Sequence, residues 1–266
     1  MQKKLPERSE GYVHGESTLR DFFKMPSEDK LQKLLGESRR IVFFSGAGIS
    51  TESGIPDFRS EDGIYSDPAN LNLFEIRTFL RDPEPFYRFT RKFLPVMEKA
   101  RPNPAHLAIA RLQDEHRVTV VTQNIDNLHR RAGSKTVCRV HGSFEYSRCL
   151  RCGNRIATRQ LYSTIREGGV PYHSCGGVYK PEVTFFGEPL PRNDWLNSQK
   201  AIEEADLLCV VGSSLVVYPA AQLPMYRSGK CKLVIVNREA TPLDDQADLI
   251  IRGSAGDIFE KLAHKI

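Results

Sequence analysis

The chain has 266 residues, of which 40% are hydrophobic and 27% charged, so its composition suits one or two globular domains with a sizeable core. The net charge is +5, and the sequence contains no dense block of Lys and Arg, which argues against nucleic acid as a partner. No apolar run approaches the roughly 20 residues of a membrane span. No apolar signal segment follows Lys3 and Lys4, so we expect a cytoplasmic protein without a membrane partner.

The N-terminal region divides into a polar arm, a helix and a strand. Residues 1–26 are polar and irregular, and we expect them to form a loosely held arm. A helical pattern begins at Ser27, with Leu31, Leu34 and Leu35 on one face. The apolar run at residues 41–44 then predicts a buried strand.

A glycine-rich segment, Ser45-Gly46-Ala47-Gly48-Ile49-Ser50-Thr51, directly follows this strand. A strand that runs into glycines and hydroxyl residues is typical of a dinucleotide-binding βα unit, because glycines let the backbone approach a pyrophosphate. The usual third glycine is replaced by Thr51, and a tight turn without a ligand is the alternative. Asp57-Phe58-Arg59 continues the segment, and a plain turn does not need an acid, an aromatic ring and a guanidinium together.

The next forty residues predict a loop and two helices. Residues 60–72 are rich in Ser, Asp, Asn, Gly and Pro, which predicts a long surface loop near the glycine-rich segment. In residues 73–99, aromatic and apolar side chains recur at helical spacing, with Pro83 and Pro85 between two helices. We interpret these side chains as packing between helices rather than as a cofactor-binding surface.

The second half contains a series of strand-like runs, each followed at once by small or polar residues. They cover residues 118–122, 138–140, 183–186, 207–211, 233–236 and 249–251. Helical stretches at residues 104–115 and 197–205 separate several of them, as in βαβ crossovers. We therefore predict an α/β fold with a Rossmann-like parallel sheet, helices on both faces and ligands at the carboxyl edge.

A cysteine motif interrupts this series. Cys149 and Cys152 form a C-x₂-C pair, and Cys175 lies 23 positions beyond Cys152, a spacing typical of a structural zinc site with four ligands. A second C-x₂-C pair would need a cysteine at Tyr172, so we assign the fourth ligand to His173. A site completed by another group, or one that folds without metal, is the alternative. The remaining cysteines lie in or beside strand runs and are expected in the core: Cys138, Cys209 and Cys231.

Taken in order, these motifs resemble those of the sirtuin family of NAD-dependent protein deacylases, over residues 28–266. The glycine-rich segment looks like the cofactor-binding loop of that family, residues 122–129 like its nicotinamide-site strand end, and His141-Gly142 like its catalytic motif. Further matching segments are Phe185-Phe186-Gly187-Glu188, residues 212–220 and residues 234–237. Residues 63–65 and 86–89 resemble the bacterial, deacetylase-type members.

The resemblance implies one catalytic domain over residues 27–266. Its large Rossmann-like part would comprise residues 27–59, 100–143 and 183–266. A smaller zinc-binding and helical part, inserted at the site, would combine a helical module at residues 60–99 with a zinc module at residues 144–182.

The resemblance also implies a role for each matching residue, with NAD as co-substrate, structural Zn²⁺ and acyl-lysine peptides as partners. The catalytic residues would be His141 and Asn124. The cofactor-binding residues would be Gly46, Ala47, Gly48, Ser50, Asp57, Phe58, Arg59, Gln123, Asn124, Ile125, Asp126, Gly212, Ser213, Ser214, Asn237, Arg238, Glu239 and Ala255. The substrate-binding residues would be Val183, Phe185, Phe186, Gly187, Glu188, Val216, Val217 and Tyr218. The histidines without such a setting are expected to be structural: His106, His116, His129 and His264.

The implied activity is an NAD-dependent protein-lysine deacetylase, which transfers the acyl group to ADP-ribose and releases nicotinamide. His141, whose ordinary pKa lies near neutrality, would take a proton from a ribose hydroxyl. The Tyr-x-x-Arg pair of desuccinylase-type members corresponds to Thr90 and Phe93 here, so we expect uncharged acyl chains such as acetyl.

Four alternatives stand beside this reading: removal of longer uncharged acyl chains, protein mono-ADP-ribosylation, hydride transfer by a dehydrogenase, and a non-catalytic binding module. The presence of His141 favours deacylation over ADP-ribosylation.

Overall fold

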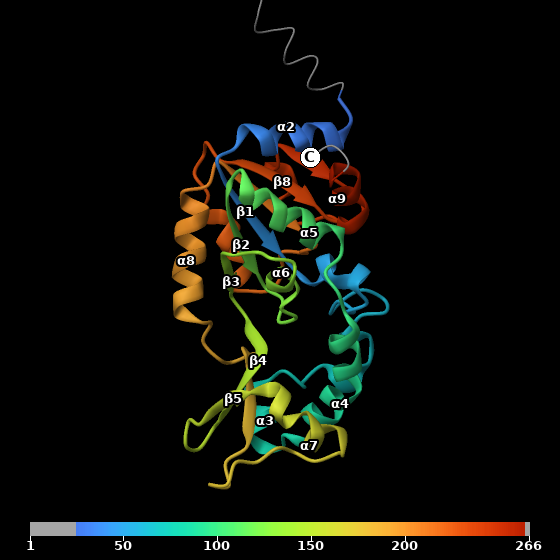
Figure 1. Ribbon diagram of the computed structural model, residues 1–266, viewed down its shortest axis with the longest axis vertical. Helices are drawn as coiled ribbons and strands as arrows, with labels where there is room; N and C mark the ends of the chain where they lie inside the picture. The colour runs from blue at the N-terminus through green and yellow to red at the C-terminus, as the bar shows by residue number, and fades with distance from the viewer. Residues whose placement is uncertain (1–24, 264–266) are drawn as a thin grey trace, which may run out of the picture.

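The computed structural model describes residues 25–263, so His264 and nearly all of the expected N-terminal arm lie outside the described residues. The described chain forms a six-stranded sheet and a three-stranded sheet (Figure 1). None of its helices is long and apolar enough to cross a membrane.

The helices and strands follow one another along the chain as shown in Figure 1. The helices are α2 (Ser27–Glu37), α3 (Ile76–Arg81), α4 (Glu84–Lys99), α5 (Pro104–Arg111), α6 (Leu128–Arg131), α7 (Tyr162–Arg166), α8 (Arg192–Glu203) and α9 (Ala255–Ala263). The strands are β1 (Arg40–Ser45), β2 (Arg117–Thr122), β3 (Val137–Arg139), β4 (Gly142–Cys149), β5 (Arg155–Ala157), β6 (Tyr179–Val183), β7 (Leu207–Val211), β8 (Lys232–Val236) and β9 (Leu249–Ile251).

The six-stranded sheet is parallel throughout, in the order β3-β2-β1-β7-β8-β9. From β1 the chain adds β2 and β3 on one side, and β7, β8 and β9 on the other. The strand order therefore reverses between β1 and β7. In open α/β sheets, ligands bind at the carboxyl ends of the strands that flank such a reversal.

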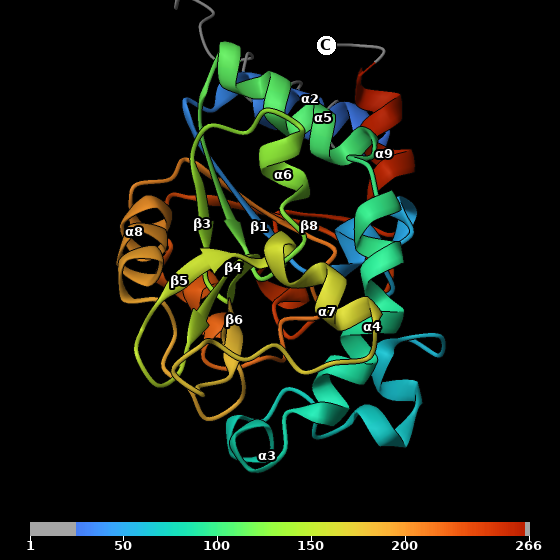
Figure 2. The ribbon, with the colours of Figure 1, turned by 60° about the horizontal axis from the view of Figure 1, so that its bottom comes forward.

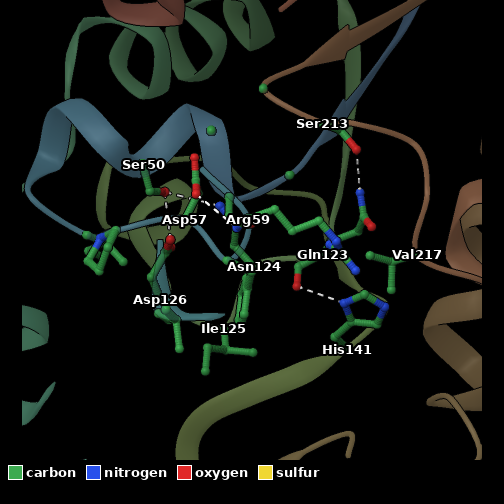
Figure 3. Close-up of a pocket in the computed structure, with 18 of the residues that line it drawn as sticks. Ser50, Asp57, Arg59, Gln123, Asn124, Ile125, Asp126, His141, Ser213 and Val217 are labelled. Carbon is green, nitrogen blue, oxygen red and sulfur yellow. Dashed lines mark hydrogen bonds between the residues drawn. The ribbon is translucent and has the colours of Figure 1, made fainter. Parts of the chain in front are cut away.

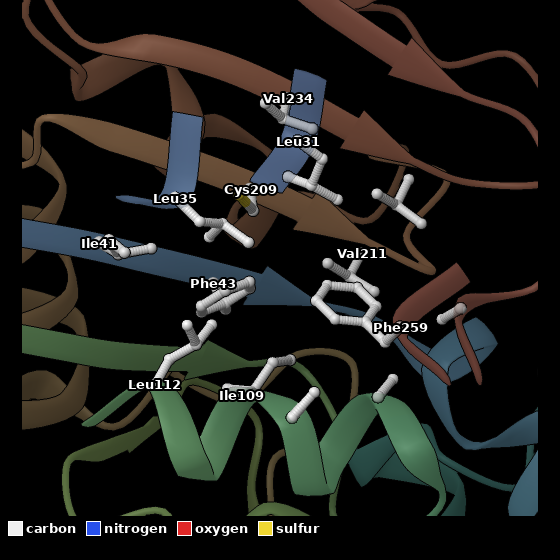
Figure 4. Close-up of a cluster of buried hydrophobic side chains, with 14 of the residues drawn as sticks. Leu31, Leu35, Ile41, Phe43, Ile109, Leu112, Cys209, Val211, Val234 and Phe259 are labelled. Atoms are coloured by element: carbon white, nitrogen blue, oxygen red, sulfur yellow. The ribbon is translucent and has the colours of Figure 1, made fainter. Parts of the chain in front are cut away.

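Helices cover both faces of this sheet, because successive residues of each buried strand point to opposite sides. Phe43 of β1 packs with α2, α5 and α9, and its ring lies 6.1 Å from that of Phe259 (Figure 4). Phe44, the next residue, belongs to the cluster on the opposite face, with Ile202 of α8 and Leu223. The fold class predicted from the sequence is confirmed, and Cys209 is buried in the first of these clusters.

The smaller sheet is antiparallel, in the order β5-β4-β6, and packs with α3, α4 and α7 (Figure 2). The sequence assigned residues 183–186 to the parallel sheet, and that assignment is wrong. β6 ends at Val183 and pairs with β4, after which Phe186 leaves the sheet and bridges Glu75. The apolar run has the same pattern in either setting, and the long-range pairing with β4 decides its place.

Two helices begin or end away from their predicted bounds. The helix expected over residues 197–205 begins earlier, at Arg192, directly after Pro191. Proline has no amide hydrogen to donate, so it is tolerated at the start of a helix and not in its interior. The helix expected over residues 104–115 ends at Arg111 and continues as the short 3₁₀ turn Leu112–Asp114.

Candidate functional site

A cavity of about 440 Å³ opens at the carboxyl edge of the parallel sheet, next to the smaller sheet (Figure 3). Of the cofactor and substrate residues that the sequence predicted, all line this cavity except Val216, which is 45% exposed. The fold thus brings together residues that are nearly 210 positions apart in the chain, from Gly46 to Ala255. Apolar residues that the sequence did not assign to a ligand also line it, among them Phe74, Phe86, Phe89 and Met97.

The glycine-rich segment packs its backbone against the loop that follows β7. The Gly46 amide donates to the Val211 carbonyl at 3.1 Å, and the Gly48 amide donates to the Gly212 carbonyl at 2.9 Å. A Cβ atom at Gly46 would lie 2.7 Å from the Gly212 oxygen, and one at Gly48 would lie 2.9 Å from it. The contact between the two loops therefore requires glycine at these two positions. This requirement adds to the one that the sequence suggested, the close approach of the backbone to a pyrophosphate.

Ser50 and the end of β2 form a second wall of the cavity. The Ser50 hydroxyl donates to Asp126 Oδ2 at 2.7 Å and accepts from Asn124 Nδ2 at 3.1 Å. The Leu128 amide donates to the other carboxylate oxygen of Asp126 at 2.9 Å. Burial raises the pKa of Asp126, although the hydrogen bonds from Ser50 and Leu128 oppose that shift. The arrangement presents an amide group and a buried carboxyl group side by side to a ligand.

His141 lies between β3 and β4, where the two sheets meet. Its Nδ1 lies 3.0 Å from the Gln123 carbonyl oxygen, which only accepts, so Nδ1 carries the proton (Figure 3). Nε2 of the neutral ring therefore holds a lone pair. Burial lowers the pKa of His141, and the bond to Gln123 partly offsets this. The ring is thus held as a neutral base in the cavity wall.

The segment after the glycine-rich loop folds back on itself. The Asp57 carboxylate accepts from the amides of Arg59 and Ser60, at 3.1 and 2.8 Å. The Tyr65 amide donates to the Phe58 carbonyl at 3.0 Å, and the two rings lie 5.4 Å apart. Asp57, predicted to bind the cofactor, thus uses its carboxylate to close the turn that positions Phe58 and Arg59 at the cavity.

Further residues that the resemblance assigned to the cofactor follow β7, β8 and β9. Gln123 Nε2 donates to Ser213 Oγ at 2.9 Å, which joins the β2 end to the β7 loop. Asn237 Nδ2 donates to the Glu239 carbonyl at 2.9 Å, which closes the turn after β8. Ala255 begins α9 and lines the same cavity.

Aromatic residues of α4 and its neighbourhood have two roles. The sequence predicted that they pack between helices, and Phe86 does pack against Phe79 and Phe185, at ring distances of 5.4 and 5.1 Å. Phe86 also lines the cavity, together with Phe89 and Phe93, whose rings stack at 5.3 Å. Helical spacing alone shows which face of α4 is apolar, and it does not distinguish a core from a cavity wall.

A cluster of four potential metal ligands lies at the far end of the smaller sheet. The donor atoms of Cys149, Cys152, His173 and Cys175 all lie within 4.8 Å of one another. Cys149 Sγ lies 3.6 Å from Cys175 Sγ, and Cys152 Sγ lies 3.4 Å from His173 Nδ1. Tetrahedral zinc bonds of about 2.0–2.3 Å place neighbouring ligand atoms roughly 3.5–3.8 Å apart, so the set fits Zn²⁺. The predicted Cys₃His site is confirmed.

Comparisons with known proteins agree on one family. A family model described as the Sir2 family matches residues 46–219. A Clostridium acetobutylicum protein named NAD-dependent protein deacetylase is 42% identical over 239 residues, which cover 87% of this chain and 96% of the relative. A Thermotoga maritima protein of the same name is 46% identical over 220 residues, which cover 81% of this chain and 89% of the relative.

Solved structures give the same result. A Sir2 complex with a deacetylated p53 peptide and 3'-O-acetyl ADP-ribose matches with a TM-score of 0.85 and 40% identity, over 90% of this chain and 98% of the other. A complex of Sir2 with a p53 peptide and NAD⁺ matches with a TM-score of 0.82 and 40% identity, over 91% and 98% of the two chains.

Proposed function

The chain belongs to the Sir2 family and is an NAD-dependent protein deacetylase, and from this premise we propose that His141 is the general base of its reaction. The hydrogen bond from Nδ1 to the Gln123 carbonyl carries this proposal, because it leaves the Nε2 lone pair to accept a proton. The lowered pKa keeps this base neutral and ready at physiological pH.

The reaction needs NAD and the acetyl-lysine held close together, so much of the catalysis is positioning. The acetyl oxygen attacks the ribose carbon that carries nicotinamide, and nicotinamide leaves. His141 then removes a proton from a ribose hydroxyl, which attacks the acetyl carbon. With one water consumed, the products are free lysine and O-acetyl-ADP-ribose. A relative has been solved with 3'-O-acetyl ADP-ribose, which supports this product.

We assign NAD to the wall made by the parallel sheet. The backbone at Gly46 and Gly48 would bind the pyrophosphate, with Arg59 beside it. Asn124 and the buried Asp126 would bind the nicotinamide carboxamide, whose NH₂ group donates and whose oxygen accepts. Phe58, held against Tyr65, would cover the reacting ribose and exclude water.

We assign the acyl-lysine peptide to the opposite wall. One edge of residues 185–188 already pairs with the chain before α3, since Phe186 donates to the Phe74 carbonyl and accepts from the Ile76 amide. A peptide strand would add beside this segment and the loop with Val217 and Tyr218, with main-chain bonds providing affinity. Exposed Phe186 and Tyr218 would contact neighbouring peptide side chains.

The central experiment is incubation of the protein with an acetyl-lysine peptide and NAD, with His141→Tyr as the test variant. We expect steady-state deacetylation, and with it the nicotinamide released over many turnovers, to fall by about 10²–10⁴-fold, the usual contribution of a general base. His116→Ala, which does not line the cavity, is the matched control. Undiminished deacetylation by His141→Tyr would refute the assignment of the base, and mass spectrometry that finds ADP-ribose on the peptide would favour ADP-ribosylation.

We further propose that the enzyme prefers uncharged acyl groups. Thr90 and Phe93 line the cavity beside Phe89 and Met97, and these four residues offer no cation to an acidic acyl chain. Acetyl-lysine and succinyl-lysine peptides supplied at equal concentration should therefore react at very different rates, with acetyl faster. Faster desuccinylation would contradict this proposal. The division into a large and a small part and the cytoplasmic location stay predictions.

A further inference from the structure

A buried lysine lies beneath the segment that lines the substrate side of the cavity. Lys180 is in β6, and its side chain is only 6% exposed. Its ammonium group lies 2.7 Å from Glu188 Oε2 and donates to the Val183 carbonyl at 2.7 Å. Burial lowers the pKa of Lys180, and the neighbouring Glu188 opposes that shift. Burying an ion pair costs desolvation energy, so its presence calls for a role other than stability. Fixing one conformation of the neighbouring segment is such a role.

The Glu188 carboxylate is occupied by the chain itself. The same oxygen that contacts Lys180 accepts the amide hydrogen of Phe185 at 2.8 Å. The Glu188 amide in turn donates to the Phe185 carbonyl at 3.0 Å. Lys180 Nζ also lies 4.2 Å from the centre of the Phe185 ring. The sequence placed Glu188 among the peptide-contacting residues, but these contacts direct its charge into its own segment.

This segment is linked directly to the proposed base. The Thr184 amide donates to the His141 carbonyl at 2.9 Å, and the fully buried Phe185 ring forms part of the cavity wall. A shift of residues 183–188 would therefore move the acyl-lysine wall relative to His141. The NAD wall, built on β1, β2 and β7, does not contain the ion pair.

We propose that Lys180 and Glu188 are a positioning pair, which holds residues 183–188 in the conformation that receives the acyl-lysine side chain. The proposal rests on the proposed function, because it assigns this wall to the peptide. It predicts a selective defect: the affinity for peptide falls, and the affinity for NAD does not.

The same strand provides a matched control. Glu182 lies two residues from Lys180 in β6 and pairs with Arg148 and Arg155 on the solvent side, at 3.0 and 2.9 Å. Glu182→Gln therefore removes both of these ion pairs from the same strand without touching residues 185–188. Exposed pairs of this kind contribute little to stability.

The test uses Lys180→Met and Glu188→Gln, singly and together, with Glu182→Gln as control and Lys180→Arg as the variant that keeps the charge. Binding of a fluorescent acetyl-lysine peptide and of NAD is measured directly, and KM, kcat and Tm are measured alongside. We expect peptide Kd and KM to rise at least tenfold in each charge-removing variant, with NAD Kd within twofold of wild type. The double variant should be little worse than either single one, because the two residues act as a unit.

Two outcomes would overturn the proposal. One is folded variants whose peptide affinity stays within twofold of wild type. The other is a parallel loss of peptide and NAD affinity with a large fall in Tm, which a general structural role would produce. Lys180→Arg retaining wild-type peptide affinity would support it. Because peptide binding is read without turnover, a wild-type protein that binds peptide without deacetylating it would refute the proposed function instead.

Discussion

The two sheets of this enzyme are stabilised in different ways. The parallel sheet is buried on both faces by mostly aliphatic side chains, and its strands β1, β7 and β8 consist almost entirely of core residues. The smaller sheet packs an aromatic cluster on one side, carries Arg–Glu pairs on the other and ends in the Cys₃His cluster. A large sheet is stabilised by its core, whereas a three-stranded sheet needs additional supports.

This difference extends to the two walls of the cavity. The wall that we assign to NAD lies at the ends of the parallel strands, where the backbones of Gly46 and Gly48 contact Gly212. The wall that we assign to the peptide contains a short segment whose backbone bonds to the side chains of the Lys180–Glu188 pair. Perturbations of the two parts should therefore produce separable defects.

Removal of the metal should have the largest effect, and it should be confined to the smaller part. Zinc binding in small folded modules is worth on the order of 10 kcal/mol, so Cys152→Ser or a chelator should unfold residues 144–182 and abolish deacetylation. Amide hydrogen exchange should show lost protection in β4 and β6 and retained protection in β1, β7 and β8. Cys231→Ala, at a buried cysteine of the larger part, should leave the zinc content unchanged. Simultaneous loss of protection in both sheets would contradict the separation.

Gly212→Ala should produce the converse defect, in the NAD wall. Gly212 has a φ of 60°, and a Cβ there would lie closer than 3.0 Å to the Ile49 amide nitrogen. Both backbone strain and this clash should cost stability, together about 3 kcal/mol or more, and displace the glycine-rich segment. NAD affinity should fall sharply while zinc content is unchanged. Gly229→Ala, where a Cβ meets nothing within 4 Å, is the control, and equal defects in the two variants would refute this explanation.

Local patterns in the sequence predicted the larger part well. Strands such as residues 207–211 and 249–251 match β7 and β9, because buried parallel strands read as short apolar runs. The C-x₂-C spacing and His173 predicted the metal ligands, because all four lie in one short module. The glycine-rich segment indicated the ligand-binding edge for the same reason: the signal is local.

What the sequence did not reveal depends on contacts between distant segments. The run at residues 183–186 looked like another parallel strand, whereas only Val183 belongs to β6, whose pairing with β4 is visible only in three dimensions. Phe86 and Phe89 were assigned to packing, since periodicity cannot show that α4 borders a cavity. The resemblance assigned Val216 and Val217 alike to the substrate, and it could not show that only Val217 lines the cavity. The contact between Lys180 and Glu188 forms only because the chain turns between them, and no pattern in the sequence showed this.

The smallest of the predicted effects is an acid sensitivity that originates in the larger part. His106 of α5 is buried, its Nε2 has no hydrogen-bond partner among the described residues, and burial lowers its pKa to about 4. In the unfolded chain His106 takes up a proton near pH 6.5, whereas in the folded chain it does so only at lower pH. Because the unfolded state binds the proton first, the free energy of unfolding falls as the pH drops. The expected loss is about 1 kcal/mol between neutral pH and pH 5.5.

Urea unfolding followed by Trp195 fluorescence can isolate this effect, because the chain has one tryptophan and it packs against the α8 face of the parallel sheet. Measurements between pH 7 and 5.5 should give a declining free energy of unfolding for wild type and a flatter profile for His106→Gln. His129, whose ring lies 4.8 Å from that of His106 and whose pKa burial also lowers, should contribute a second slope in the same direction. The double variant His106→Gln/His129→Gln should therefore be the least sensitive to acid. An identical slope in wild type and double variant would place the acid-sensitive groups elsewhere, and a slope that tracks zinc release would place them in the smaller part.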